Sequence, residues 1–139
     1  SYFLQTKSVD YEVFILGSII GFLCVGVLNL NNIRDIENDS KMNKKTIPTR
    51  IGFKNAKFYH YCLIILSILL ILTFATEFKI SNNFIFIIVG IIPISFHLFK
   101  VNQAKSPIEF KPLLKQLAIS IFFFSIFMSI FLIYESIFF

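Results

Sequence analysis

The sequence predicts an all-α protein built as a multi-span bundle of transmembrane helices, and three observations lead to this fold class. First, 56% of the 139 residues are hydrophobic, and the mean hydropathy is +0.77. Second, charged residues make up only 15% of the chain, whereas soluble domains carry about a quarter. Third, the apolar residues gather in runs close to the ~20 residues that a helix needs to cross a bilayer. We therefore expect a lipid bilayer to surround most of the chain.

The apolar runs predict four spans, covering residues 11–31, 56–76, 82–99 and 117–137. The third run is the shortest, and it reaches a full crossing only if the helix begins near Ser81. Cys24 and Cys62 fall inside the first two runs. Each is expected to act there as a small buried hydrophobe rather than as half of a disulfide.

The positions of lysine and arginine predict how these spans are oriented. Seven of the 13 basic residues lie from Arg34 to Lys57, and four more lie from Lys100 to Lys115. Cytoplasmic loops of membrane proteins carry such an excess of positive charge. We therefore expect loops 32–55 and 100–116 to be cytoplasmic, with both chain ends outside, in the cell (inner) membrane. Because the basic residues flank apolar spans, the net charge of +5 indicates a membrane rather than nucleic acid as the partner.

Two carboxylates stand where the first span ends. Asp35 and Asp39 are four residues apart, so on a helix they lie one above the other and can hold a cation between them. Mg²⁺ keeps several waters and usually takes one or two carboxylates together with phosphate oxygens. The spacing alone also fits a solvated helix end in which lysine or arginine relieves the repulsion between the two acids.

Small residues on the first span predict which face of that helix packs. Gly17 and Gly21 form a small-xxx-small pattern, which lets a second helix approach closely. At about 100° per residue they share one narrow stripe with Asp35 and Asp39. We therefore expect this stripe, and with it both acids, to face the interior of the bundle.

Polar and basic residues around the acids would suit a diphosphate ester. Asn31 and Asn32 precede Asp35 by about one turn, and amides in this position bind either a neighbouring helix or a ligand. Arg34 is expected to point away from the acidic stripe, toward another helix or a phosphate oxygen. The following basic residues could neutralise phosphate charge: Lys41, Lys44, Lys45 and Arg50. His60 and His97 belong to no metal-binding motif, so packing or interface roles are expected for them.

Several of these segments resemble a known family. Residues 30–39, which contain Asn-Asn-Ile-Arg-Asp, and residues 44–52 are similar to the second aspartate-rich motif of the UbiA superfamily of intramembrane prenyltransferases. Residues 2–6 and 111–115 are similar to the branch of this family that serves menaquinone biosynthesis. The resemblance covers most of the chain. Asn43 stands where the family pattern places a glycine before the basic pair.

The resemblance implies a fold, a reaction and a set of roles. Family members have about nine helices and use Mg²⁺ to bind a polyprenyl diphosphate, whose prenyl group passes to an aromatic acid acceptor, here 1,4-dihydroxy-2-naphthoate. It implies that Asp35 and Asp39 are metal ligands and take part in catalysis, and that Asn31 and Asn32 line the pocket. Arg34, Lys44 and Arg50 would contact the diphosphate.

The resemblance also implies that part of the enzyme is missing. No first motif of the Asn-Asp-x-x-Asp kind occurs in residues 1–139. We therefore expect the chain to be the C-terminal part of a single prenyltransferase domain, with four of about nine helices, and to be inactive alone.

Two alternatives remain open from the sequence. One is a prenyltransferase with another aromatic acceptor, such as 4-hydroxybenzoate. The other is a non-enzymatic membrane protein that binds or transports an ion. A transporter is expected to place ionisable groups near the middle of the bilayer, and the four runs carry none there, which counts against it.

Overall fold

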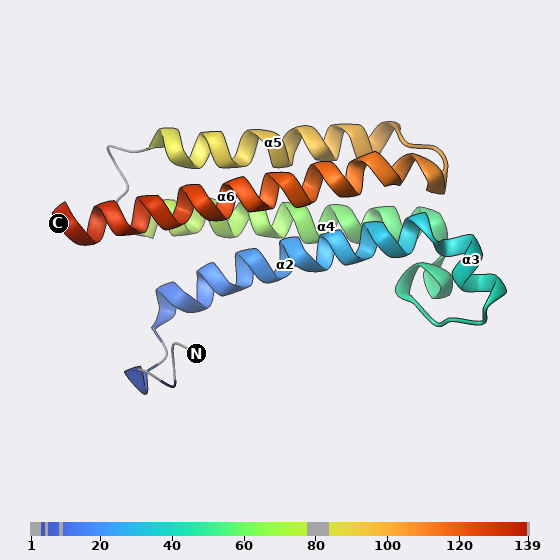
Figure 1. Cartoon of the computed structure of the whole chain (residues 1–139), viewed down its shortest axis with the longest axis horizontal. Coiled ribbons are helices and arrows are strands. Elements are labelled where there is room, and N and C mark those ends of the chain that lie inside the picture. The colour runs from blue at the N-terminus through green and yellow to red at the C-terminus, as the bar shows by residue number, and fades with distance from the viewer. Residues whose placement is uncertain (1–3, 5, 9, 78–83, 139) are drawn as a thin grey trace.

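The structure, a computed structural model, describes residues 4, 6–8, 10–77 and 84–138. Its helices are α2 (Tyr11–Arg34), α3 (Ile36–Lys41), α4 (Ile47–Glu77), α5 (Phe84–Gln103) and α6 (Phe110–Phe138), with a 3₁₀ turn, η1 (Pro107–Glu109), before α6. The four long helices lie side by side, and α3 projects at one end with the loop that follows it (Figure 1). Throughout the described residues no strand occurs, so the predicted all-α helical bundle is confirmed.

Three helices within the described segments are long and apolar enough to cross a membrane: Tyr11–Arg34, Ile47–Thr76 and Pro107–Ile133. The protein is therefore a membrane protein. The helices extend beyond the predicted spans: α4 begins at Ile47 and α6 begins at Phe110. The reason is that polar residues flanking the apolar runs are helical as well. Residues 82 and 83 of the predicted third span lie outside the described residues.

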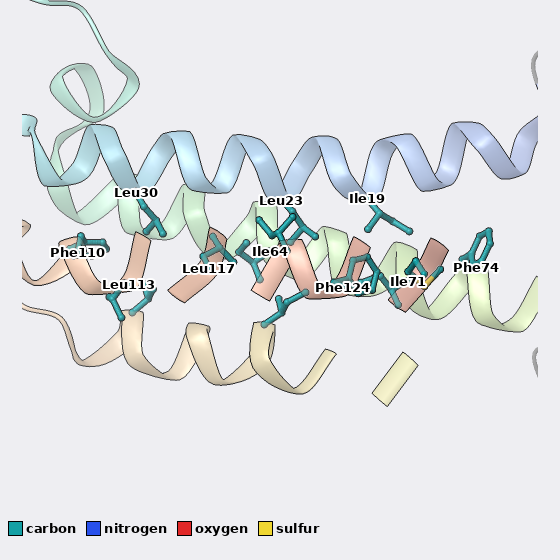
Figure 2. Close-up of a cluster of buried hydrophobic side chains, with 14 of the residues drawn as sticks. Ile19, Leu23, Leu30, Ile64, Ile71, Phe74, Phe110, Leu113, Leu117 and Phe124 are labelled. Carbon is teal, nitrogen blue, oxygen red and sulfur yellow. The ribbon is translucent and has the colours of Figure 1, made fainter. Parts of the chain in front are cut away.

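Aliphatic and aromatic side chains from all four long helices, α2, α4, α5 and α6, form the core (Figure 2). Ile19, Leu23 and Leu30 of α2 recur at helical spacing and are at most 1% exposed. They meet side chains such as Ile64 of α4 and Leu117 of α6 (Figure 2). Because lipid is as apolar as leucine, close packing rather than escape from water holds such helices together.

The glycines that permit close helix approach are not the predicted ones. Gly17 and Gly21 are exposed, and an added Cβ at either would meet nothing within 4 Å, so the expectation that their stripe packs inside this bundle was wrong. A Cβ at Gly26 would lie 3.1 Å from Ile64 Cδ1, and one at Gly90 would lie 2.6 Å from Phe124 Cδ2. The branched side chains on a different face of α2 decide which side is buried.

The cysteines also differ from the prediction. Cys24 and Cys62 are both exposed free thiols, because each lies on the side of its helix that faces away from the core. The expectation of a free cysteine holds, whereas the expectation that it is buried was wrong.

A break in α4 separates its first turn from its long apolar part. Gly52 has φ 80° and ψ 163°, a conformation that is essentially restricted to glycine. The short helical segment before Gly52 therefore belongs to the loop region at the end of the bundle.

Candidate functional site

The acidic turn, defined here as residues 31–45, lies where α2 passes into α3 at one end of the bundle (Figure 1). Asp35 separates the two helices, with φ −95° and ψ 7°. Its N–H still donates to the Asn31 carbonyl at 3.1 Å, and the Asp39 N–H donates to the Asp35 carbonyl at 2.8 Å. The two acids are thus one turn apart along the backbone, as their spacing predicts.

The Arg34 guanidinium forms two hydrogen bonds with the Asp35 carboxylate, one to each oxygen. Nε donates to Oδ1 at 2.7 Å, and Nη2 donates to Oδ2 at 2.6 Å. These hydrogen bonds hold the pKa of the Asp35 carboxyl below its ordinary value; partial burial acts in the opposite direction, and the charge of Lys44 adds to the lowering. The expectation that Arg34 points away from the acids was wrong. Because Asp35 leaves the regular helical conformation, its side chain turns back to its neighbour.

Asp39 is satisfied on one oxygen only. The residue is 7% exposed, and Lys44 Nζ donates to its Oδ1 at 3.1 Å. Its Oδ2 is buried and has no hydrogen-bond partner in the described part of the chain. A buried carboxylate oxygen without a donor or cation is costly, so Asp39 Oδ2 is the atom of the turn that most needs a ligand.

The loop between α3 and α4 is shaped by Asn43 and by two threonines. Asn43 adopts φ 54°, a left-handed conformation that asparagine tolerates better than most residues. It can therefore replace the expected glycine before the basic pair. Thr46 and Thr49 cap the start of α4, since the Thr46 N–H donates to Thr49 Oγ1 at 2.8 Å and the Thr49 N–H donates to Thr46 Oγ1 at 3.4 Å.

The side chains of the other predicted binding residues, four within this turn and Arg50 beyond it, do not contact the acids through hydrogen bonds or ion pairs. Asn31 and Asn32 are half-buried, and their side chains form no hydrogen bond with any described residue. Lys41, Lys45 and Arg50 are exposed and form no ion pair within the described ranges. Of the predicted cations, the structure brings only Arg34 and Lys44 onto the carboxylates, and the other three form no ion pair with a described residue.

Sequence reasoning missed Asn29. This residue is 3% exposed, and its Nδ2 donates to the Ala56 carbonyl of α4 at 3.0 Å. Its Oδ1 is buried without a partner among the residues described. An amide inside an apolar run was the available signal, because such amides often bond to neighbouring membrane helices.

A second polar cluster lies inside the bundle. His60 of α4 and His97 of α5 are fully buried, with their Nε2 atoms 3.0 Å apart. Neither Nδ1 has a partner in the portion described. The contact agrees with the expected packing role, although the pairing itself was not predicted.

The acidic turn fits a hard divalent cation. Within the described residues no group of three or more histidine, cysteine and acidic side chains forms a complete metal cage. Magnesium does not require one, since one or two carboxylates with water and phosphate oxygens suffice. Asp39 Oδ2, buried and unpaired, is one such donor, whereas both oxygens of Asp35, one turn earlier, already accept hydrogen bonds from Arg34.

Comparison with known proteins identifies relatives. The chain is 34% identical over 119 residues to 1,4-dihydroxy-2-naphthoate octaprenyltransferase from Haemophilus influenzae, an alignment covering 85% of this chain and 38% of the relative. It is 35% identical to the Escherichia coli protein of the same name over 74 residues, covering 53% of this chain and 24% of that protein. The Bacillus subtilis protein of that name is 42% identical over 57 residues, covering 40% and 18%.

The chain therefore spans well under half the length of these relatives. No solved structure matches it significantly. The model of the UbiA prenyltransferase family matches residues 1–126, and this match includes the acidic turn and most of the helical bundle. The chain belongs to the UbiA prenyltransferase family.

Proposed function

We propose that the chain is the C-terminal part of a membrane enzyme that transfers a polyprenyl group from a polyprenyl diphosphate to 1,4-dihydroxy-2-naphthoate, a step of menaquinone biosynthesis. The relatives named above all carry that acceptor in their names. The observation that carries the proposal is the acidic turn, where Asp39 Oδ2 is buried and unpaired and where Lys41 and Lys45 follow as exposed cations. A chain lacking the first aspartate motif is expected to be inactive alone.

The cation-binding side of the site would be formed by Asp35 and Asp39. Members of this family generally depend on a divalent metal, and we assign Mg²⁺ because the donors are hard carboxylate oxygens. When bound, the metal supplies Lewis-acid neutralisation of the charge on the departing diphosphate. Arg34 keeps Asp35 ionised and fixes its orientation through two hydrogen bonds.

The basic residues of the turn, together with Arg50 of α4, would hold the diphosphate. Lys41, Lys45 and Arg50 are exposed and unpaired within the described structure, so their charges are available to phosphate oxygens. Arginine grips two oxygens at once, whereas each lysine acts as a point charge. Lys44 already contacts Asp39 Oδ1, so it could share its protons between that oxygen and a phosphate. Together these groups would stabilise negative charge that builds up as the carbon–oxygen bond of the donor breaks.

The amides and the bundle would bind the rest of the substrates. Asn31 and Asn32 have free side-chain groups one turn before Asp35, where they could orient the acceptor or the diphosphate. The prenyl hydrocarbon would lie along the apolar helices. The basic loops 32–55 and 100–116 are expected on the cytoplasmic side of the inner membrane, where the soluble acceptor and the released diphosphate have access.

The test uses the complete enzyme in membranes, with prenyl diphosphates of several lengths as donors. We expect magnesium-dependent transfer to 1,4-dihydroxy-2-naphthoate in preference to 4-hydroxybenzoate. Asp39→Asn should reduce turnover by more than about 100-fold, because several kcal/mol of charge stabilisation is lost. Glu37→Gln is the matched control, since Glu37 is an exposed acid of the same helix.

Either of two results would contradict the proposal. Preferred use of 4-hydroxybenzoate would reassign the acceptor. Equal turnover of Asp39→Asn and Glu37→Gln would show that the carboxylate pair takes no part in the reaction.

A further inference from the structure

An amphipathic groove runs between α5 and α6, on a part of the bundle that the acidic turn does not use. The two helices lie side by side along their length (Figure 1). A hollow of about 610 Å³ between them is walled by apolar side chains, including Ile92 and Phe96 of α5 and Ile119 of α6. These three side chains are 59%, 51% and 45% exposed, so the groove is open to its surroundings.

Each wall of this groove changes from apolar to cationic at the same end. On α5, Ile92, Phe96 and Lys100 follow one another at four-residue spacing and so lie in one row. On α6, Ile119 and Lys115 form a row of the same kind. Because α5 ends where the connection to α6 begins, both lysines stand at the end that carries this connection (Figure 1).

The two lysines are available to an anion. Lys100 Nζ lies 4.7 Å from the centre of the Phe96 ring, against the apolar wall. Neither Lys100 nor Lys115 forms an ion pair with a described carboxylate. Glu109 lines an adjoining polar hollow of about 320 Å³ together with Lys100, but its carboxylate already accepts hydrogen bonds from the Ser106 hydroxyl and the Ser106 and Lys105 N–H groups.

We infer that this groove binds an anionic phospholipid, with one acyl chain between α5 and α6 and the phosphate between Lys100 and Lys115. Along the helix axes the groove is lined first by apolar side chains and then, at one end, by the two lysines. An anionic phospholipid has the matching arrangement, with an acyl chain followed by a negatively charged phosphate. Basic pockets between membrane helices are suited to anionic head groups. A zwitterionic lipid would bind more weakly, because its own cationic group would lie beside the two lysines.

The experiment measures the lipid that the complete enzyme retains. The protein is taken from nanodiscs of equimolar phosphatidylglycerol and phosphatidylcholine into mild detergent, and bound lipids are counted by native mass spectrometry. We expect phosphatidylglycerol to be enriched at least about fivefold among retained lipids, the factor that corresponds to one favourable lysine contact. K100Q/K115Q should abolish this enrichment, whereas K105Q/K111Q, which removes the same charge from the same end of the bundle but from outside the two hollows, should keep it.

A second variant tests the apolar part of the groove. Ile119→Trp fills the hollow and should lower the number of retained lipids without changing the thermal stability of the protein. The inference is overturned if the parent retains the two lipids equally, or if K100Q/K115Q keeps the enrichment. It is also overturned if Ile119→Trp leaves lipid retention unchanged, or if the purified protein is a lipid-free dimer held through this face.

Discussion

The acidic turn and the interior of the bundle satisfy their polar groups in different ways. In the acidic turn, the two aspartates pair with residues close to them in sequence, Asp35 with Arg34 and Asp39 with Lys44. In the interior, the histidine contact joins α4 to α5 across 37 residues. The Asn29 contact joins α2 to α4 across 27 residues.

This difference separates two kinds of residue. The local pairs join no two long helices, and under the proposed function they prepare charges for a ligand. Long-range contacts fix how the helices pack, because an unmade hydrogen bond inside a membrane bundle leaves a buried group without water. Substitutions in the acidic turn should therefore change activity with little effect on stability, whereas substitutions in the interior should change stability.

A large stability effect is expected at Gly26, the glycine where α2 meets α4. Gly26→Leu should lower the free energy of unfolding by about 3 kcal/mol, the upper end for overpacking, because even a Cβ there lies 3.1 Å from Ile64 Cδ1. Gly21→Leu is the matched control on the same helix. It meets open space and should cause no loss. Unfolding by denaturing detergent measures both; equal losses would mean that both faces of α2 pack.

A smaller effect is expected from the histidine pair. His60→Leu should lower the free energy of unfolding by about 2 kcal/mol, because the Nε2 of His97 is left buried without a partner. The double variant H60L/H97L should lose clearly less than the sum of the two single losses, since neither polar ring remains. Strict additivity in the same unfolding experiment would show that the two rings do not depend on each other.

The features that could be predicted from sequence are the local ones. Run length and hydropathy predicted the long helices, because crossing a bilayer requires a fixed number of apolar residues. The four-residue spacing of Asp35 and Asp39 correctly predicted one helical turn between them. The replacement of the family's glycine by Asn43 also has a local explanation, since asparagine adopts the left-handed conformation that the loop has there.

The predictions that were wrong concern contacts with residues far away in the sequence. Gly17 and Gly21 carry the same pattern as a packed face, but only the positions of Ile64 and Phe124 show that Gly26 and Gly90 are the close contacts. Arg34 was expected to point elsewhere, because a regular helix separates neighbouring side chains. The pairing of two histidines on different helices has no signature in either helix alone.

The central claim is that the acidic turn binds a divalent cation together with a diphosphate. The most direct test is electron paramagnetic resonance of Mn²⁺, used in place of Mg²⁺, bound to the complete enzyme in the presence of a prenyl diphosphate. We predict a bound-manganese signal that is present in Glu37→Gln and strongly reduced in both Asp35→Asn and Asp39→Asn. An unchanged signal in the two aspartate variants would contradict the claim.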